Sequence, residues 1–105
     1  MQPTPEQLQS LVQRICDTVH PLRIILFGPA ARGDMEPTSA IDVAVVVAEG
    51  TNRHQMYEQL YPSMAGLGIA VKIVVTTAQQ LETHRSSIGF VHQEIVREGR
   101  DLYPA

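Results

Sequence analysis

The chain has 105 residues and a formal net charge of −3, a length that predicts one small domain without a second core. Acidic residues outnumber basic ones 11 to 8, and Trp is absent. This balance argues against a nucleic-acid surface, which usually combines a basic stripe with stacking aromatic rings, but it does not exclude a small nucleotide ligand. The polar N-terminus and the lack of any membrane-length apolar run predict a cytoplasmic protein with no membrane contact.

The predicted elements begin with an amphipathic helix over residues 5–19, with Thr4 as its N-cap and Pro5 at its first position. Residues 22–27 form a short apolar run of strand length. Residues 28–39 are rich in Gly, Pro, Asp and Ser, which predicts a loop with a helical turn starting at Pro29. The β-branched run 41–48 predicts the clearest strand.

The second half continues the alternation of helices and strands. Residues 52–64 are a predicted helix with an apolar stripe of Met56, Leu60 and Met64, and residues 69–76 are the third strand. Two helices follow at 78–85 and 88–97, with Gly89 as a weak point and Gly99 as the C-cap, and 101–103 form a short edge strand. The order predicts an α/β (α+β) fold over residues 1–105, a single domain whose small mixed sheet is flanked by helices.

The stretch 26–47, LFGPAARGDMEPTSAIDVAVVV, carries the residues that point to chemistry. Nucleotidyl transfer needs a turn whose amides and hydroxyl hold the triphosphate, and two or three carboxylates that hold Mg²⁺. Strand residues two apart project from one face, so an Asp-x-Asp pair plus an acid from a neighbouring strand supplies the carboxylates. Here Asp42 stands near the start of the strand, and Ala40 comes two residues before it.

This stretch resembles the minimal nucleotidyltransferases (MNT) of the DNA polymerase β superfamily. The resemblance covers almost the whole chain, in the segments 25–28 (ILFG), 31–34 (ARGD), 39–43 (SAIDV), 71–75 (VKIVV) and 97–103 (REGRDLY). It implies a nucleotidyltransferase fold, and it places Gly28, Pro29 and Arg32 at the nucleotide-binding positions. It also places Asp42 at the position of a retained catalytic acid, and Ala40 and Lys72 at the positions of two lost acids.

These departures from the family pattern lie at the positions that do the chemistry. Pro29 stands where the family has a phosphate-binding serine, and proline has neither an N–H nor a hydroxyl. With Ala40 and Lys72 in place of two acids, the set carries roughly zero charge instead of about −3. We therefore expect no cofactor, no metal beyond what Asp42 could hold, and weak or no nucleotide binding. Mg²⁺ is expected only if the chain is active.

The resemblance implies two alternative functions. One is a non-catalytic binding module, such as an MNT-type antitoxin acting with a HEPN partner, with homo-oligomerisation as a further mode of association. The other is an active Mg-dependent nucleotidyltransferase that moves a nucleoside monophosphate from ATP to a protein or small molecule.

Individual side chains also leave alternatives open. Lys72 either pairs with Asp42 in the space of the missing metal or is an ordinary solvated lysine. Arg32 is expected to hold its own loop by pairing with one of three acids: Asp34, Glu36 or Asp42. Cys16 is expected to be a small core residue. The four histidines lack a zinc-ligand spacing and are expected in surface or capping roles: His20, His54, His84 and His92.

Overall fold

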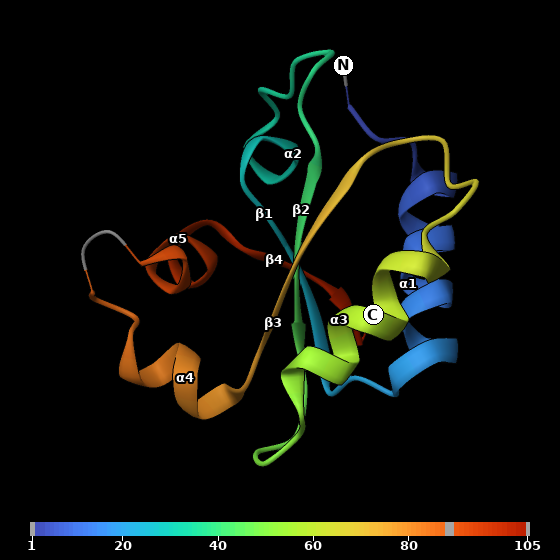
Figure 1. The fold of residues 1–105 in the computed structure, drawn as a ribbon. Helices are drawn as coiled ribbons and strands as arrows, with labels where there is room; N and C mark the ends of the chain where they lie inside the picture. Colours follow the sequence, from blue (N-terminus) through green and yellow to red (C-terminus); the bar gives the residue numbers. More distant parts are fainter. Residues whose placement is uncertain (1, 88–89, 105) are drawn as a thin grey trace.

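The computed structural model describes residues 2–87 and 90–104, and in this part of the chain helices and strands alternate as the sequence predicts. The elements are α1 (Pro5–Val19), β1 (Arg23–Phe27), α2 (Pro29–Arg32), β2 (Ile41–Val46), α3 (Arg53–Ser63), β3 (Val71–Thr76), α4 (Ala78–Thr83), α5 (Val91–Glu98) and β4 (Arg100–Tyr103). They form three layers, with α1 and α3 on one side of the sheet and α4 and α5 on the other (Figure 1). Among the described helices, none is long and apolar enough to cross a membrane.

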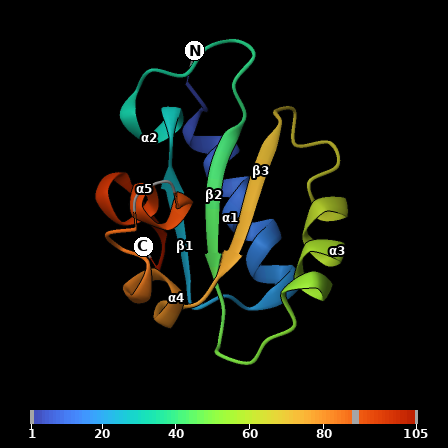
Figure 2. The same ribbon diagram turned by 60° about the vertical axis from the view of Figure 1, so that its left-hand side comes forward.

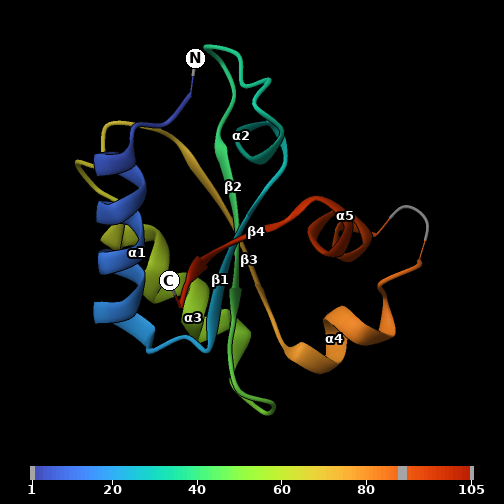
Figure 3. The same cartoon turned by 180° about the vertical axis from the view of Figure 1, so that it is seen from behind.

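The sheet is mixed, which confirms the predicted α+β class. Its strand order is β3-β2-β1-β4; β1 is antiparallel to both of its neighbours, and β2 is parallel to β3 (Figure 2). From behind, β4 is seen to follow directly from α5 and to lie beside β1 (Figure 3). The register sets Asp42 opposite Phe27 on one side and opposite Lys72 on the other.

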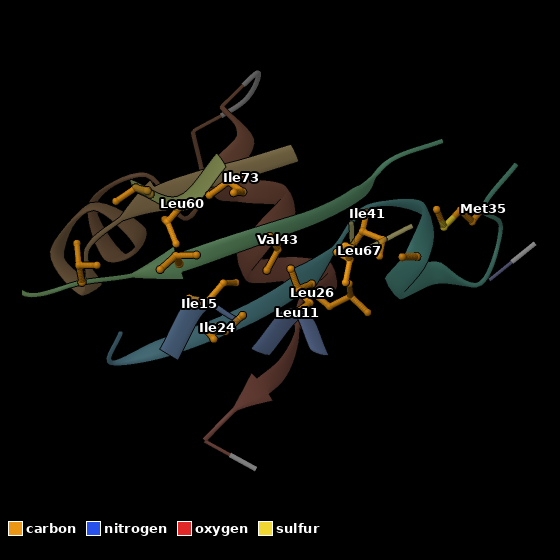
Figure 4. Packing of buried hydrophobic residues seen from close by; sticks show 14 residues of the cluster. Leu11, Ile15, Ile24, Leu26, Met35, Ile41, Val43, Leu60, Leu67 and Ile73 are labelled. Atoms are coloured by element: carbon orange, nitrogen blue, oxygen red, sulfur yellow. The ribbon is translucent and has the colours of Figure 1, made fainter. Parts of the chain in front are cut away.

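Alternation along the strands divides the buried side chains between the two faces of the sheet. The face beneath α1 and α3 carries the larger core, in which Leu11, Ile15 and Leu60 are fully buried (Figure 4). Each such side chain contributes roughly 1.5–3 kcal/mol through burial. A smaller cluster lies on the α5 face: Ile25, Phe27, Ala44, Val46, Leu81 and Ile95. Asp42 and Lys72 share the parity of this second face, so the candidate site lies on the α5 side.

Helix α1 has the predicted bounds and the predicted cap. The Thr4 hydroxyl accepts from the Gln7 N–H at 3.0 Å, and the Gln7 side chain accepts from the Thr4 N–H at 3.0 Å, which together make a capping box. Further along α1, Arg14 donates to the carbonyls of Ser63 at 3.0 Å and Ala65 at 2.6 Å. This arginine therefore joins α1 to the end of α3.

The exposed edge of β3 is closed by two tyrosines of α3. The N–H of Ile73 donates to the Tyr61 hydroxyl at 3.0 Å, and the N–H of Val75 donates to the Tyr57 hydroxyl at 2.8 Å. The two rings stack with centroids 6.2 Å apart. Unpaired edge N–H groups are a template for strand addition, and side-chain oxygens satisfy two of them here.

Several predicted boundaries need correction. The strands predicted at 22–27, 41–48 and 69–76 are each one or two residues shorter in the structure, as β1, β2 and β3. The helix predicted at 52–64 is shorter because Asn52 and Met64 cap it, and the one predicted at 78–85 ends at Thr83. The predicted start of the last helix, at residues 88 and 89, lies outside the described residues. Gly99 does cap α5, but with φ −67° it is extended and not left-handed.

Candidate functional site

The turn after β1 is built by Gly28 and Pro29. Gly28 has φ 70° and ψ −156°, and Pro29 opens the single helical turn of α2, as predicted. The N–H groups of Ala31 and Arg32 both donate to the carbonyl of Gly28, at 3.0 and 3.1 Å. Two amides of this turn are thus used within the turn, and position 29 has no amide hydrogen to offer a ligand.

Gly28 is required by a close approach as well as by its backbone angles. A Cβ at this position would overlap the carboxylate of Asp42, the second residue of β2. The conformation with positive φ and extended ψ is also reached almost only by glycine. The end of β1 and the start of β2 are therefore in direct contact through a glycine backbone and a carboxylate.

The carboxylate of Asp42 lies in an environment that disfavours its charge. Burial raises its pKa, and Glu94 of α5 adds to the rise, while the nearby cations Lys72 and Arg32 oppose it. Within the described residues, the carboxylate of Asp42 forms no hydrogen bond or ion pair. Its desolvation is compensated only by longer-range attraction.

Lys72 lies directly opposite Asp42 in the parallel β2–β3 register, but its side chain is exposed. Among the ion pairs found in residues 2–87 and 90–104, none joins the two. The predicted ion pair is therefore not formed as a direct contact, because Lys72 extends into solvent. Ala40, half-exposed, immediately precedes β2, so the three positions that the sequence relates to catalytic acids do converge at one end of the sheet.

Arg32, at the end of α2, is held mainly by α5. Its Nη1 donates to Glu98 at 2.8 Å and lies 3.5 Å from Glu94, while its Nε donates to Asp34 at 3.3 Å. The predicted pair with Asp34 is confirmed. Pairs with Glu36 and Asp42 are absent from the described part of the chain, and the α5 acids take their place. The guanidinium thus connects the turn after β1 to α5.

The nucleotidyltransferase domain family matches residues 8–103. The chain belongs to this family. A chain in the crystal structure of a toxin–antitoxin with AMP-PNP has the same fold, with a TM-score of 0.69 at 23% identity over 93% of this chain and 73% of that one. No match is found among curated proteins.

In this nucleotidyltransferase domain, sequence reasoning located the turn and the strand positions but missed the partners of Arg32. The available signal was the spacing of Glu94 and Glu98, since residues four apart lie on one face of a helix. Within residues 2–87 and 90–104, no three His, Cys, Asp or Glu side chains are grouped so that they could hold a metal ion.

Proposed function

We propose that this nucleotidyltransferase-family chain is a non-catalytic binding module that acts in the cytoplasm with a protein partner. An MNT-type antitoxin acting with a HEPN partner is the form of this function that we favour. The observation that carries the proposal is the pairing of positions 42 and 72 in the β2–β3 register, with a carboxylate on one strand and an ammonium on the other.

The donor set is a poor fit for Mg²⁺. This ion prefers octahedral oxygen ligands, loses its water reluctantly and needs carboxylates to offset that loss. Asp42 offers one carboxylate, Ala40 offers no donor, and Lys72 contributes a positive charge at the same level of the sheet. Burial also raises the pKa of Asp42, so a cation there would meet a single acid that is already disfavoured as an anion.

The turn after β1 is likewise a poor fit for a triphosphate. A phosphate grip in such a turn uses a hydroxyl and free backbone N–H groups. Pro29 supplies neither, and the amides of Ala31 and Arg32 donate to Gly28. Arg32, the cationic group of this turn, is surrounded by Asp34, Glu94 and Glu98. These residues favour weak or no nucleotide binding.

The proposed lack of catalysis is tested with labelled ATP. The purified chain is incubated with Mg²⁺ or Mn²⁺ and candidate partner proteins, and we expect no transfer of label. Metal-dependent labelling that disappears in Asp42→Ala would overturn the proposal and establish the alternative, an active transferase of nucleoside monophosphate. A triple variant, Pro29→Ser, Ala40→Asp and Lys72→Asp, serves as the matched comparison, and we expect it to bind Mn²⁺ more tightly than the natural chain.

The partner half rests on the fold shared with a structure described as a toxin–antitoxin. Co-expression with the protein encoded by the neighbouring gene, which this proposal expects to be a HEPN protein, followed by size-exclusion chromatography with light scattering, tests it directly. We expect a stable complex of both chains. A clean monomer that does not associate with this neighbour would contradict the antitoxin form, and self-association alone would favour the homo-oligomer.

A further inference from the structure

The first turn of α5 contains a histidine that is fixed to the end of β3. The Nε2 of His92 lies 2.9 Å from the hydroxyl of Thr76, the last residue of β3, which is fully buried. The other ring nitrogen, Nδ1, is buried and has no hydrogen-bond partner among the described residues. Nδ1 is unpaired in either protonation state, but in the imidazolium it would be a buried, charged N–H without an acceptor, which costs more than the unpaired nitrogen of a neutral ring.

The groups that face His92 also disfavour a positive charge. His84, the C-cap of α4, has its ring centroid 5.6 Å away, and it stacks on Phe90 at 4.5 Å with an interplanar angle of 3°. Arg53, the first residue of α3, adds a permanent positive charge within electrostatic reach. The position of His92 at the N-terminal end of α5 places it near the positive end of that helix dipole. Burial first, then His84 and Arg53, lower the pKa of His92.

We propose that neutral His92 holds α5 against the sheet, next to the turn that carries Arg32. Protonation of His92 then lets α5 separate from the sheet. Glu94 and Glu98 lie on the same helix and hold Arg32. When α5 opens, Arg32 loses both acids, and Asp42 loses the neighbouring carboxylate of Glu94. Protonation of His92 at mildly acidic pH therefore exposes the candidate site, whichever activity that site has.

The direction of the pH dependence of α5 opening follows from proton linkage. In the unfolded chain, His92 binds a proton near the ordinary histidine pKa of about 6.5, whereas in the folded chain it binds one only at lower pH. Between these two pKa values the open state binds more protons than the folded state. The packing of α5 on the sheet therefore becomes less stable as the pH drops through this range. Above about pH 7 the contribution of the neutral His92 is fully present.

The test is amide hydrogen exchange in α5 at about pH 7.5 and about pH 5.5, corrected for the intrinsic rate and compared with α1. We expect opening of α5 to increase at the lower pH while that of α1 is unchanged, because the open state binds the His92 proton more readily than the folded state. His92→Gln keeps a hydrogen-bonding group but cannot titrate, so its α5 should not respond to pH. His54→Gln, which changes a histidine whose side chain is 82% exposed, should behave like the natural chain.

Histidine NMR titration of the natural chain provides a second readout that does not depend on the folding of any variant. We expect the His92 midpoint to lie below about 6.5, and α5 opening to increase as the pH falls from about 6.5 towards that midpoint. An ordinary or raised midpoint for His92, or α5 exchange that is the same at both pH values, would overturn the proposal. An equal pH response in His92→Gln and the natural chain would do so as well.

Discussion

Asp42 and Lys72 lie directly opposite each other on β2 and β3, yet their side chains form no ion pair. Lys72 is exposed, and Asp42 is half-buried against Gly28. The lysine lowers the pKa of Asp42 through space, but burial outweighs it. The two side chains therefore interact only through space, without a direct contact.

A double-mutant cycle with Asp42→Asn and Lys72→Met measures the attraction between the two side chains. Because Lys72 is solvated, we expect a coupling below about 1 kcal/mol in urea unfolding, within the range of exposed ion pairs. A larger coupling would mean that Lys72 folds onto Asp42 in solution and occupies the space of a metal.

Asp42→Asn should also change how stability depends on pH. Since the folded protein raises the pKa of Asp42, it holds a proton at pH values where the unfolded chain has released it. Stability therefore falls as the pH rises from the unfolded value of about 3.9 through the raised folded value. The variant should be the more stable protein at neutral pH, and the difference should disappear in acid. Urea unfolding across this range checks it, and equal stability at neutral pH would contradict it.

Gly28→Ala should be far more damaging than Gly33→Ala, although both glycines have positive φ. At Gly33 a Cβ meets open space, so we expect only the left-handed penalty of about 1–2 kcal/mol. At Gly28 the new Cβ also overlaps the Asp42 carboxylate, which should add at least about 2 kcal/mol. Asp42→Ala in the same chain should restore part of that loss, and simple additivity in thermal or urea unfolding would exclude the contact as its cause.

Tyr57→Phe and Tyr61→Phe each leave one N–H of β3 without its acceptor. We expect each to lower the free energy of unfolding by about 0.5–1.5 kcal/mol. Tyr103→Phe is the matched control, because the Tyr103 hydroxyl makes no hydrogen bond within the described residues. If all three substitutions cost the same, the edge hydrogen bonds carry no stability of their own.

Local signals in the sequence predicted most of the fold. Thr4 and Pro5 fix the start of α1, and β-branched runs give the strands. Gly28 and Pro29 predict the short turn of α2. Each of these signals acts over a few residues, so no tertiary contact is needed to interpret it. The family match over residues 8–103 confirms the resemblance carried by the same segments.

The long-range contacts of the candidate site could not be predicted in the same way. Arg32 has an acid two residues away, and local reasoning found it, but its shorter contact is with Glu98, 66 residues further along. The resemblance places Asp42 and Lys72 at positions that converge, with an ion pair or a solvated lysine as alternatives. The choice between them depends on how β3 lies at the edge of the sheet, which leaves Lys72 exposed. His92 gave no periodic or motif signal, because its partner Thr76 lies 16 residues away and is brought to it only by the tertiary fold.

The alternation of side chains along β2 separates the candidate site from the large core. Ile41 and Val43 face the large core, whereas position 42 between them faces the candidate site, and Ala40 and Lys72 lie at the same end of the sheet. Substitutions at 40, 42 and 72 therefore leave the packing under α1 and α3 intact. The residues of the candidate site can therefore be changed without altering the core that supports the fold.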